Sequence, residues 1–155
     1  MAAGFQEPGS EDRAGTERRS AASPARRARR AVLAGLGLAA VTGAVLVLLP
    51  ASFVRGAVSN LLTLIAAIYV GFSISSRGEL SLARQSLGAG VFFVLALFGL
   101  WFDWWWLAIG LVAHGGWDLA HHPRRGHRGV PAWYVPFCAA YDWAVAAVVV
   151  AYYMV

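Results

Sequence analysis

Five long apolar runs, separated by short polar segments, follow a polar N-terminal region in this chain of 155 residues. Each run approaches the roughly 20 residues that an α-helix needs to cross a bilayer. Backbone groups in lipid must bond within their own segment, and no run alternates apolar and polar residues as the strands of a membrane barrel do. The pattern therefore predicts an all-α fold, a bundle of five transmembrane helices at residues 32–49, 57–74, 86–102, 104–121 and 133–155.

Residues 1–30 have a different composition, because Gly, Ser, Pro, Glu and Arg dominate and no apolar period occurs. Such a segment buries too little apolar surface to offset the entropy of the ordered chain. We expect a disordered, arginine-rich tail at 1–30 and a transmembrane domain at 31–155. The tail ends in ARRARR, a basic flank that membrane topology alone explains, and we expect it to meet anionic lipid headgroups rather than nucleic acid.

The arginines lie mainly on one side of the predicted bundle. The chain is 59% hydrophobic and only 14% charged, which excludes an ordinary soluble domain. Cytosolic segments carry the excess of basic residues, so the tail and the second and fourth connectors are expected inside, with the C-terminus outside. The use of arginine in place of lysine, with much Ala, Gly and Val, indicates a bacterial protein and hence the inner (plasma) membrane. The connector arginines on the cytosolic side are Arg77, Arg84, Arg124, Arg125 and Arg128, whereas Arg55 lies on the other side.

Small residues recur every four positions on the first predicted helix, at Gly35, Ala39 and Gly43. Such spacing lets another helix backbone approach closely. This face packs either within the bundle or between two copies in a homo-oligomer.

Polar residues form a stripe on each of three predicted helices. The segment HGGWDLAHH places its polar residues at i, i+4, i+7 and i+8, which is one helical face. The same spacing recurs on the second and fifth helices, and all three stripes lie in the cytosolic half, so we expect them to meet. The three sets are His114, Asp118, His121 and His122; Tyr134, Cys138, Tyr141 and Asp142; and Tyr69, Ser73, Ser76 and Arg77.

His114 and Asp142 are the deepest of these residues. An ionisable side chain facing lipid near the bilayer centre costs about 2.5 to 3.5 kcal/mol. We therefore expect both side chains to face the bundle interior and to form a direct or water-bridged pair.

Two functions remain open for this polar cluster. In the first, the protein is a metal-dependent membrane hydrolase for a lipid or amphiphile, because imidazole and carboxylate bind zinc and iron. In the second, the cluster is a polar packing network or proton path in a small transporter or a structural subunit. A bis-histidine haem is disfavoured, because every histidine lies on one helix or the loop after it. The first function assigns metal binding to His114, Asp118, His121 and His122, catalysis to Asp142 and Tyr141, and substrate binding to Tyr69, Ser73 and Arg77.

The HxxxDxxHH segment, followed by a basic loop and WYVPFCAAYDW, resembles an uncharacterised family of small bacterial polytopic integral membrane proteins. The resemblance implies membrane placement and no particular activity. The segment is also similar to two groups of membrane metalloenzymes. One is the histidine-box lipid hydroxylases and desaturases, which use more than the four histidines present here. The other is the ceramidase-like hydrolases, in which His114, His121, Asp142 and Ser73 would be the counterparts.

Overall fold

The computed structural model describes residues 23–76, 80–121 and 129–155. Within these segments the chain forms helices and no strand, which confirms the all-α fold. The helices are α2 (Pro24–Leu48), α3 (Ala51–Ser75), α4 (Leu82–Trp101), α5 (Trp105–Ala120) and α6 (Tyr134–Met154).

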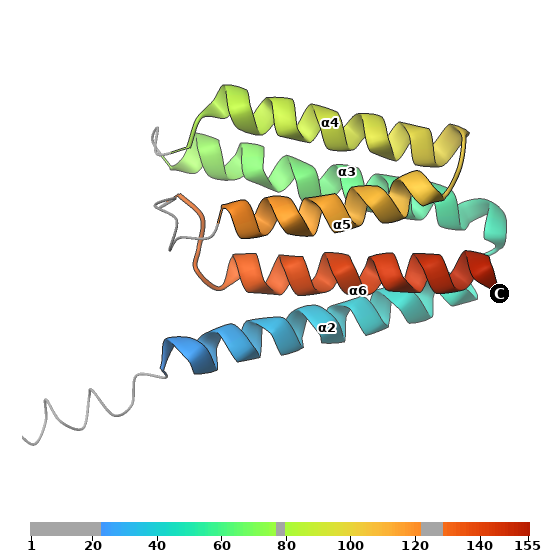
Figure 1. Ribbon diagram of the computed structural model, residues 1–155, viewed down its shortest axis with the longest axis horizontal. Helices are drawn as coiled ribbons and strands as arrows, with labels where there is room; N and C mark the ends of the chain where they lie inside the picture. The colour runs from blue at the N-terminus through green and yellow to red at the C-terminus, as the bar shows by residue number, and fades with distance from the viewer. Residues whose placement is uncertain (1–22, 77–79, 122–128) are drawn as a thin grey trace, which may run out of the picture.

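The helices lie side by side and alternate in direction (Figure 1). In space, α4 packs on α3 and α5, α5 packs on α6, and α6 packs on α2. The start of α2 lies at the same end of the bundle as the α3–α4 and α5–α6 connections. We call this the N-terminal end, and the opposite end, which holds the α4–α5 connection and Val155, the C-terminal end.

The first helix begins earlier than the sequence predicted. The side chain of Ser23 accepts a hydrogen bond from the backbone N–H of Arg26, and Pro24 occupies the first helical position, where its missing N–H costs nothing. Residues 24–30 are therefore helical, so the prediction of a disordered tail at 1–30 is wrong for these residues, and residues 1–22 lie outside the described residues. Pro50 separates α2 from α3, which begins at residue 51 rather than 57.

Within the described part of the chain, four helices, α2, α3, α4 and α6, are long and apolar enough to cross a membrane, which indicates a multi-pass membrane protein. The remaining helix, α5, has 16 residues and is about 24 Å long at 1.5 Å per residue. The hydrocarbon core of a bilayer is about 30 Å thick. A fifth crossing and the orientation of the bundle thus stay predictions.

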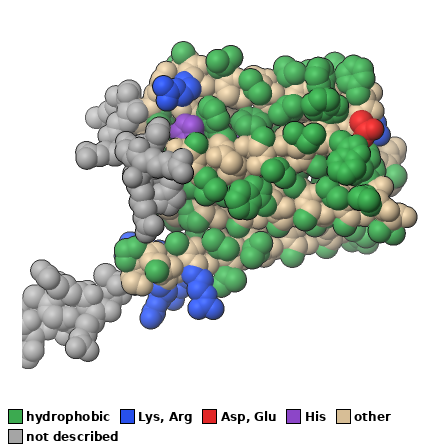
Figure 2. Space-filling view, in the orientation of Figure 1, with side chains coloured by type: hydrophobic (Ala, Val, Ile, Leu, Met, Phe, Trp, Pro, Cys, Tyr) green, Lys and Arg blue, Asp and Glu red, His purple; other side chains and the backbone are tan. Residues whose placement is uncertain are grey.

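Large apolar side chains cover much of the outer surface (Figure 2). Leu87 and Ile74 have exposed fractions of 72% and 69%. Soluble monomers rarely expose continuous apolar patches of this kind. The surface therefore agrees with the length of the helices in indicating an apolar environment.

The small residues of α2 are used within the chain. Gly35, Ala39 and Gly43 are buried where α2 meets α6. A Cβ atom at Gly35 would overlap the carbonyl oxygen of Phe137 on α6. The predicted packing face thus lies inside the bundle, and its use between copies stays a prediction.

We expect Gly35→Ala to lower the stability of the protein by about 1–3 kcal/mol, because the added methyl group meets backbone atoms that cannot rotate away. Gly37→Ala is the matched control, since a Cβ at Gly37 has nothing within 4 Å. Thermal unfolding of the two variants in detergent checks this expectation. Equal melting temperatures for the two would contradict the close approach of α2 and α6.

Candidate functional site

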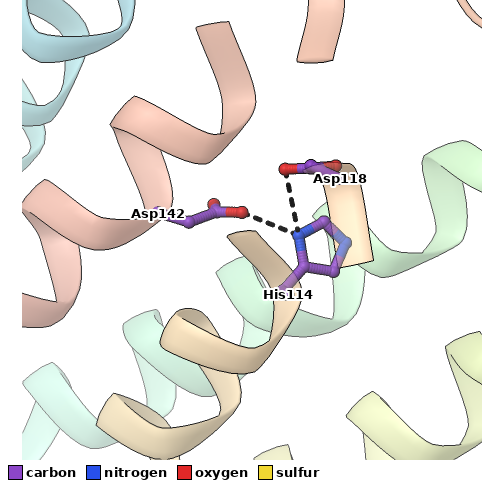
Figure 3. Close-up of side chains that lie close together, drawn as sticks. All are labelled: His114, Asp118 and Asp142. Atoms are coloured by element: carbon purple, nitrogen blue, oxygen red, sulfur yellow. Dashed lines mark hydrogen bonds and ion pairs between the residues drawn. The ribbon is translucent and has the colours of Figure 1, made fainter. Parts of the chain in front are cut away.

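Three ionisable side chains meet in the middle of the bundle. His114 and Asp118 lie one turn apart on α5, and Asp142 faces them from α6 (Figure 3). All three have an exposed fraction of 0%. We call this group the inner cluster. It confirms the expectation that His114 and Asp142 face the interior.

Both carboxylates approach the same nitrogen of the His114 imidazole (Figure 3). Its Nδ1 donates to Oδ2 of Asp142 at 2.7 Å, and the same nitrogen lies 3.8 Å from Oδ2 of Asp118. The direct pair of His114 and Asp142 is therefore confirmed. The inner cluster is also the group whose donor atoms, one from each residue, all lie within 4.8 Å of one another, so it could hold a metal ion.

A third helix joins the cluster through Tyr69 of α3. Its hydroxyl donates to Oδ1 of Asp118 at 2.6 Å, and its ring is 1% exposed. Tyr69, Asp118, His114 and Asp142 thus form a continuous polar chain across α3, α5 and α6. The expectation that polar stripes of three helices meet is confirmed for these four residues.

Several polar atoms of the cluster keep unused bonding capacity. Oδ2 of Asp118, Oδ1 of Asp142 and Nε2 of His114 are buried and have no hydrogen-bond partner among the described residues. Buried polar atoms in folded proteins nearly always have a partner. Two carboxylates that approach the same imidazole nitrogen, each with an unpartnered oxygen, are what a bound cation would satisfy.

Aromatic side chains close the sides of the inner cluster, and the sequence patterns did not single them out. The edge of the Phe92 ring on α4 contacts the His114 ring, with centroids 4.9 Å apart. On α6 the indole of Trp143 donates to the carbonyl oxygen of Val112 and packs on Gly115, beside His114 in the chain. Phe92 and Trp143 are apolar residues, so the spacing of polar residues in the sequence could not have identified them.

We expect Gly115→Ala to lower the melting temperature, because the new Cβ would lie 2.5 Å from Nε1 of Trp143 and would break the indole's bond to Val112. The matched control is Gly116→Ala, where a Cβ has nothing within 4 Å. Thermal unfolding of both variants measures the difference. A destabilisation as large in the control would mean that loss of glycine alone, and not Trp143, explains the effect.

His121 lies nearer the N-terminal end, outside the inner cluster. Its Nδ1 donates to the carbonyl oxygen of Trp117 at 2.9 Å, and its Nε2 accepts from the side-chain amide of Gln85 at 3.1 Å. The sequence analysis missed Gln85, which is 1% exposed, because it placed the start of the third predicted helix at residue 86. Ser81, whose side chain caps α4, is the signal that could have included Gln85 in the helix.

The other predicted site residues lie apart from the inner cluster or outside the described residues. The hydroxyl of Tyr141 is 3.0 Å from that of Thr42 on α2, so it points away from Asp142. Ser73 donates to the carbonyl oxygen of Val70 in its own helix. His122 and Arg77 lie outside the described residues. The roles assigned to these residues stay predictions.

The chain matches no protein-family model, no curated protein and no solved structure. The resemblance to a family of small bacterial membrane proteins therefore stays a prediction, and the function has to be argued from the site itself.

Proposed function

We propose that this protein is a multi-pass membrane protein that binds a divalent zinc or iron ion in its inner cluster. The observation that carries the proposal is the convergence of one imidazole and two carboxylates, all with 0% exposure and with donor atoms within 4.8 Å. An ionisable residue inside an apolar bundle is costly, and its presence there is a functional signal by default.

The charge of the inner cluster supports a divalent ion. Asp118 and Asp142 bring two negative charges when ionised, and a neutral His114 brings none. Among the described residues no arginine forms an ion pair with either carboxylate. Buried charges are stable only when they are paired or bind a metal, and one divalent ion neutralises two carboxylates. Neutral imidazole and carboxylate are ordinary ligands of zinc and iron.

The distances within the cluster also fit. Two ligand atoms at about 2.0–2.2 Å from a tetrahedral metal ion lie about 3.4 Å from each other. The two distances from Nδ1 of His114 to the carboxylate oxygens, 2.7 and 3.8 Å, lie on either side of this value. Small movements of the side chains, together with release of the Nδ1 proton as the ion binds, would thus exchange the present hydrogen bond for coordination. Tyr69, which donates to Asp118, would orient that ligand from outside the coordination sphere.

We infer that the bundle crosses the plasma membrane five times, with the N-terminal end in the cytosol. Exposed arginines gather at this end (Figure 2), where Arg26, Arg27, Arg29, Arg30 and Arg84 begin α2 and α4. Basic residues mark the cytosolic side, where anionic headgroups would meet them. The short α5 begins within the tryptophan-rich segment WFDWWW, and indole rings favour the membrane interface, so α5 would span with its ends close to the headgroups.

Hydrolysis of a lipid or amphiphile requires a path from the lipid to the cluster. A groove of about 720 Å³ lies between α5 and α6, but it lies on the outer surface, and Trp143, which lines it, packs over Gly115. A bound amphiphile would have to displace this indole to reach His114. We therefore propose metal binding alone. Hydrolysis of an amphiphile at the metal would require Trp143 to move.

A proton-exchanging polar network is the second candidate. It is favoured by the continuous chain from Tyr69 through Asp118 and His114 to Asp142, in which neighbouring groups lie within 4 Å. This network would be neutral with protons alone. It predicts that the purified protein holds no metal.

Elemental analysis of the full-length protein, purified in detergent and loaded with zinc or iron, tests the proposal. We expect about one metal ion per chain in the wild type and loss of most of it in Asp142→Asn and His114→Gln, which keep the shape of the side chains. Tyr141→Phe is the matched control, because Tyr141 is also buried on α6 but its hydroxyl faces Thr42. A metal-free wild type after loading, or full occupancy in Asp142→Asn, would refute metal binding and leave the polar network.

A further inference from the structure

Among the residues that the structure describes, the turns next to the inner cluster differ in character between the two ends of the bundle. Towards the C-terminal end, the neighbouring turns of three helices carry aliphatic side chains that are completely buried. They are Leu62 of α3, Leu107 and Leu111 of α5, and Val145 and Val149 of α6, each with an exposed fraction of 0%. The described buried polar groups on this side lie several turns further away: Ser59, whose hydroxyl donates to the carbonyl oxygen of Ala96, and the hydroxyl of Tyr153 near the end of α6.

Towards the N-terminal end the corresponding turns carry buried polar groups. Gln85 of α4, His121 of α5 and Tyr134 of α6 are 1%, 4% and 6% exposed. We call these three residues the outer layer. The side-chain amide of Gln85 is hydrogen-bonded to His121, which links α4 to α5.

The outer layer keeps unused acceptors. Among the described residues, Oε1 of Gln85 is buried without a hydrogen-bond partner, and the buried hydroxyl of Tyr134 has only the thiol of Cys138 beside it. An unpartnered amide oxygen in an apolar surrounding costs free energy, and a carbonyl-type oxygen holds zinc or iron more weakly than imidazole or carboxylate does, as a transient site requires. The two atoms give this layer the same property as the inner cluster, namely buried oxygens with free lone pairs.

Tyr69 lies between the two layers. Its ring centroid is 5.0 Å from that of His121 and 6.1 Å from that of Tyr134, and 6.0 Å from that of His114. Its hydroxyl is held by Asp118 of the inner cluster. The ring therefore separates the outer layer from the metal ligands, and a rotation that breaks the bond to Asp118 would join them.

We propose that the outer layer is a second, transient cation subsite, through which a metal ion enters the inner cluster from the N-terminal end, past Tyr69. This inference rests on the proposed metal binding. Oε1 of Gln85 is the first ligand on the route among the described residues, and the Tyr69 hydroxyl holds the route closed while Asp118 accepts its hydrogen bond.

Zinc exchange in proteoliposomes tests the route. Full-length protein loaded with zinc is reconstituted, protease cleavage of the N-terminal tail reports orientation, and an impermeant chelator is added outside. We expect zinc to be removed only from molecules whose N-terminal end faces the chelator. Tyr69→Ala should accelerate removal at least tenfold, and Gln85→Leu should slow zinc uptake about tenfold while the final occupancy stays unchanged.

Leu111→Ala is the matched control, because it shortens a buried side chain on the opposite side of the cluster and should leave the exchange rate unchanged. Two results would overturn the route: zinc removal from molecules in the reverse orientation, or an unchanged rate in Tyr69→Ala protein that still holds zinc. If Tyr69→Ala fails to fold, the rate of zinc uptake in Gln85→Leu and the dependence of zinc removal on orientation still test the route. A wild type that takes up no zinc refutes the route together with the metal site, whereas stoichiometric zinc with exchange from both sides refutes the route alone.

Discussion

Replacing His114 with leucine is expected to destabilise the protein by about 3–5 kcal/mol, because it leaves two buried carboxylates without a basic partner. Both Asp118 and Asp142 are fully buried, so water cannot take the place of the imidazole. The free energy of unfolding in mixed detergent measures the loss. This is one of the two largest effects that we expect from a change to the chain.

The triple variant His114→Leu, Asp118→Asn, Asp142→Asn separates charge from packing. It removes both carboxylates along with the imidazole and should regain most of the stability lost in His114→Leu, since an uncharged cluster has no unpaired charge to bury. It should still bind no metal. If the triple variant is as unstable as the single one, the loss comes from the shape of the His114 site against Phe92 and not from charge.

Removal of the metal is expected to produce the second large effect. A ligand that binds only the folded state stabilises it by RT ln(1 + [L]/Kd), which is about 2.7 kcal/mol when its concentration is 100 times Kd. A chelator should therefore lower the melting temperature of the zinc-loaded wild type, and added zinc should restore it. Thermal unfolding with and without chelator measures this change.

The triple variant is also the control for this measurement. Its melting temperature should be the same with zinc and with chelator, because it has lost the ligands of the inner cluster. If neither zinc nor the chelator changes the melting temperature of the wild type, the result would favour the proton-exchanging network. An equal response in the triple variant would place the metal elsewhere on the chain.

The central pair of the site could be predicted from the sequence for a physical reason. A histidine or an aspartate on a helix in an apolar environment is costly when it faces lipid. The side chains of His114 and Asp142 were therefore expected to point into the bundle interior, where they can pair. The i, i+4 spacing then placed Asp118 on the same face as His114. The depth of these residues in the membrane and the period of the helix were together sufficient to predict that the residues of the inner cluster meet.

Other features depended on packing that the sequence pattern does not contain. Tyr141 and Asp142 are neighbours about 100° apart on a helix, so they face different helices, and Tyr141 turned towards Thr42 of α2. The wall formed by Phe92 and Trp143 consists of apolar residues among many others of that kind. The early start of α2 came from a cap at Ser23, a local signal inside a segment that composition alone marked as irregular.

The order of the helices in space differs from their order in the chain, since α6 lies between α2 and α5 (Figure 1). Of the described helices, the ribosome makes α2 before the others and its packing partner α6 after them. Until α6 emerges, the glycine face of α2 has no partner helix, and the His114–Asp118 pair lacks the second carboxylate. The same helix thus closes the bundle and completes the site, and a chain that stops before Tyr134 would lack both the partner of α2 and Asp142.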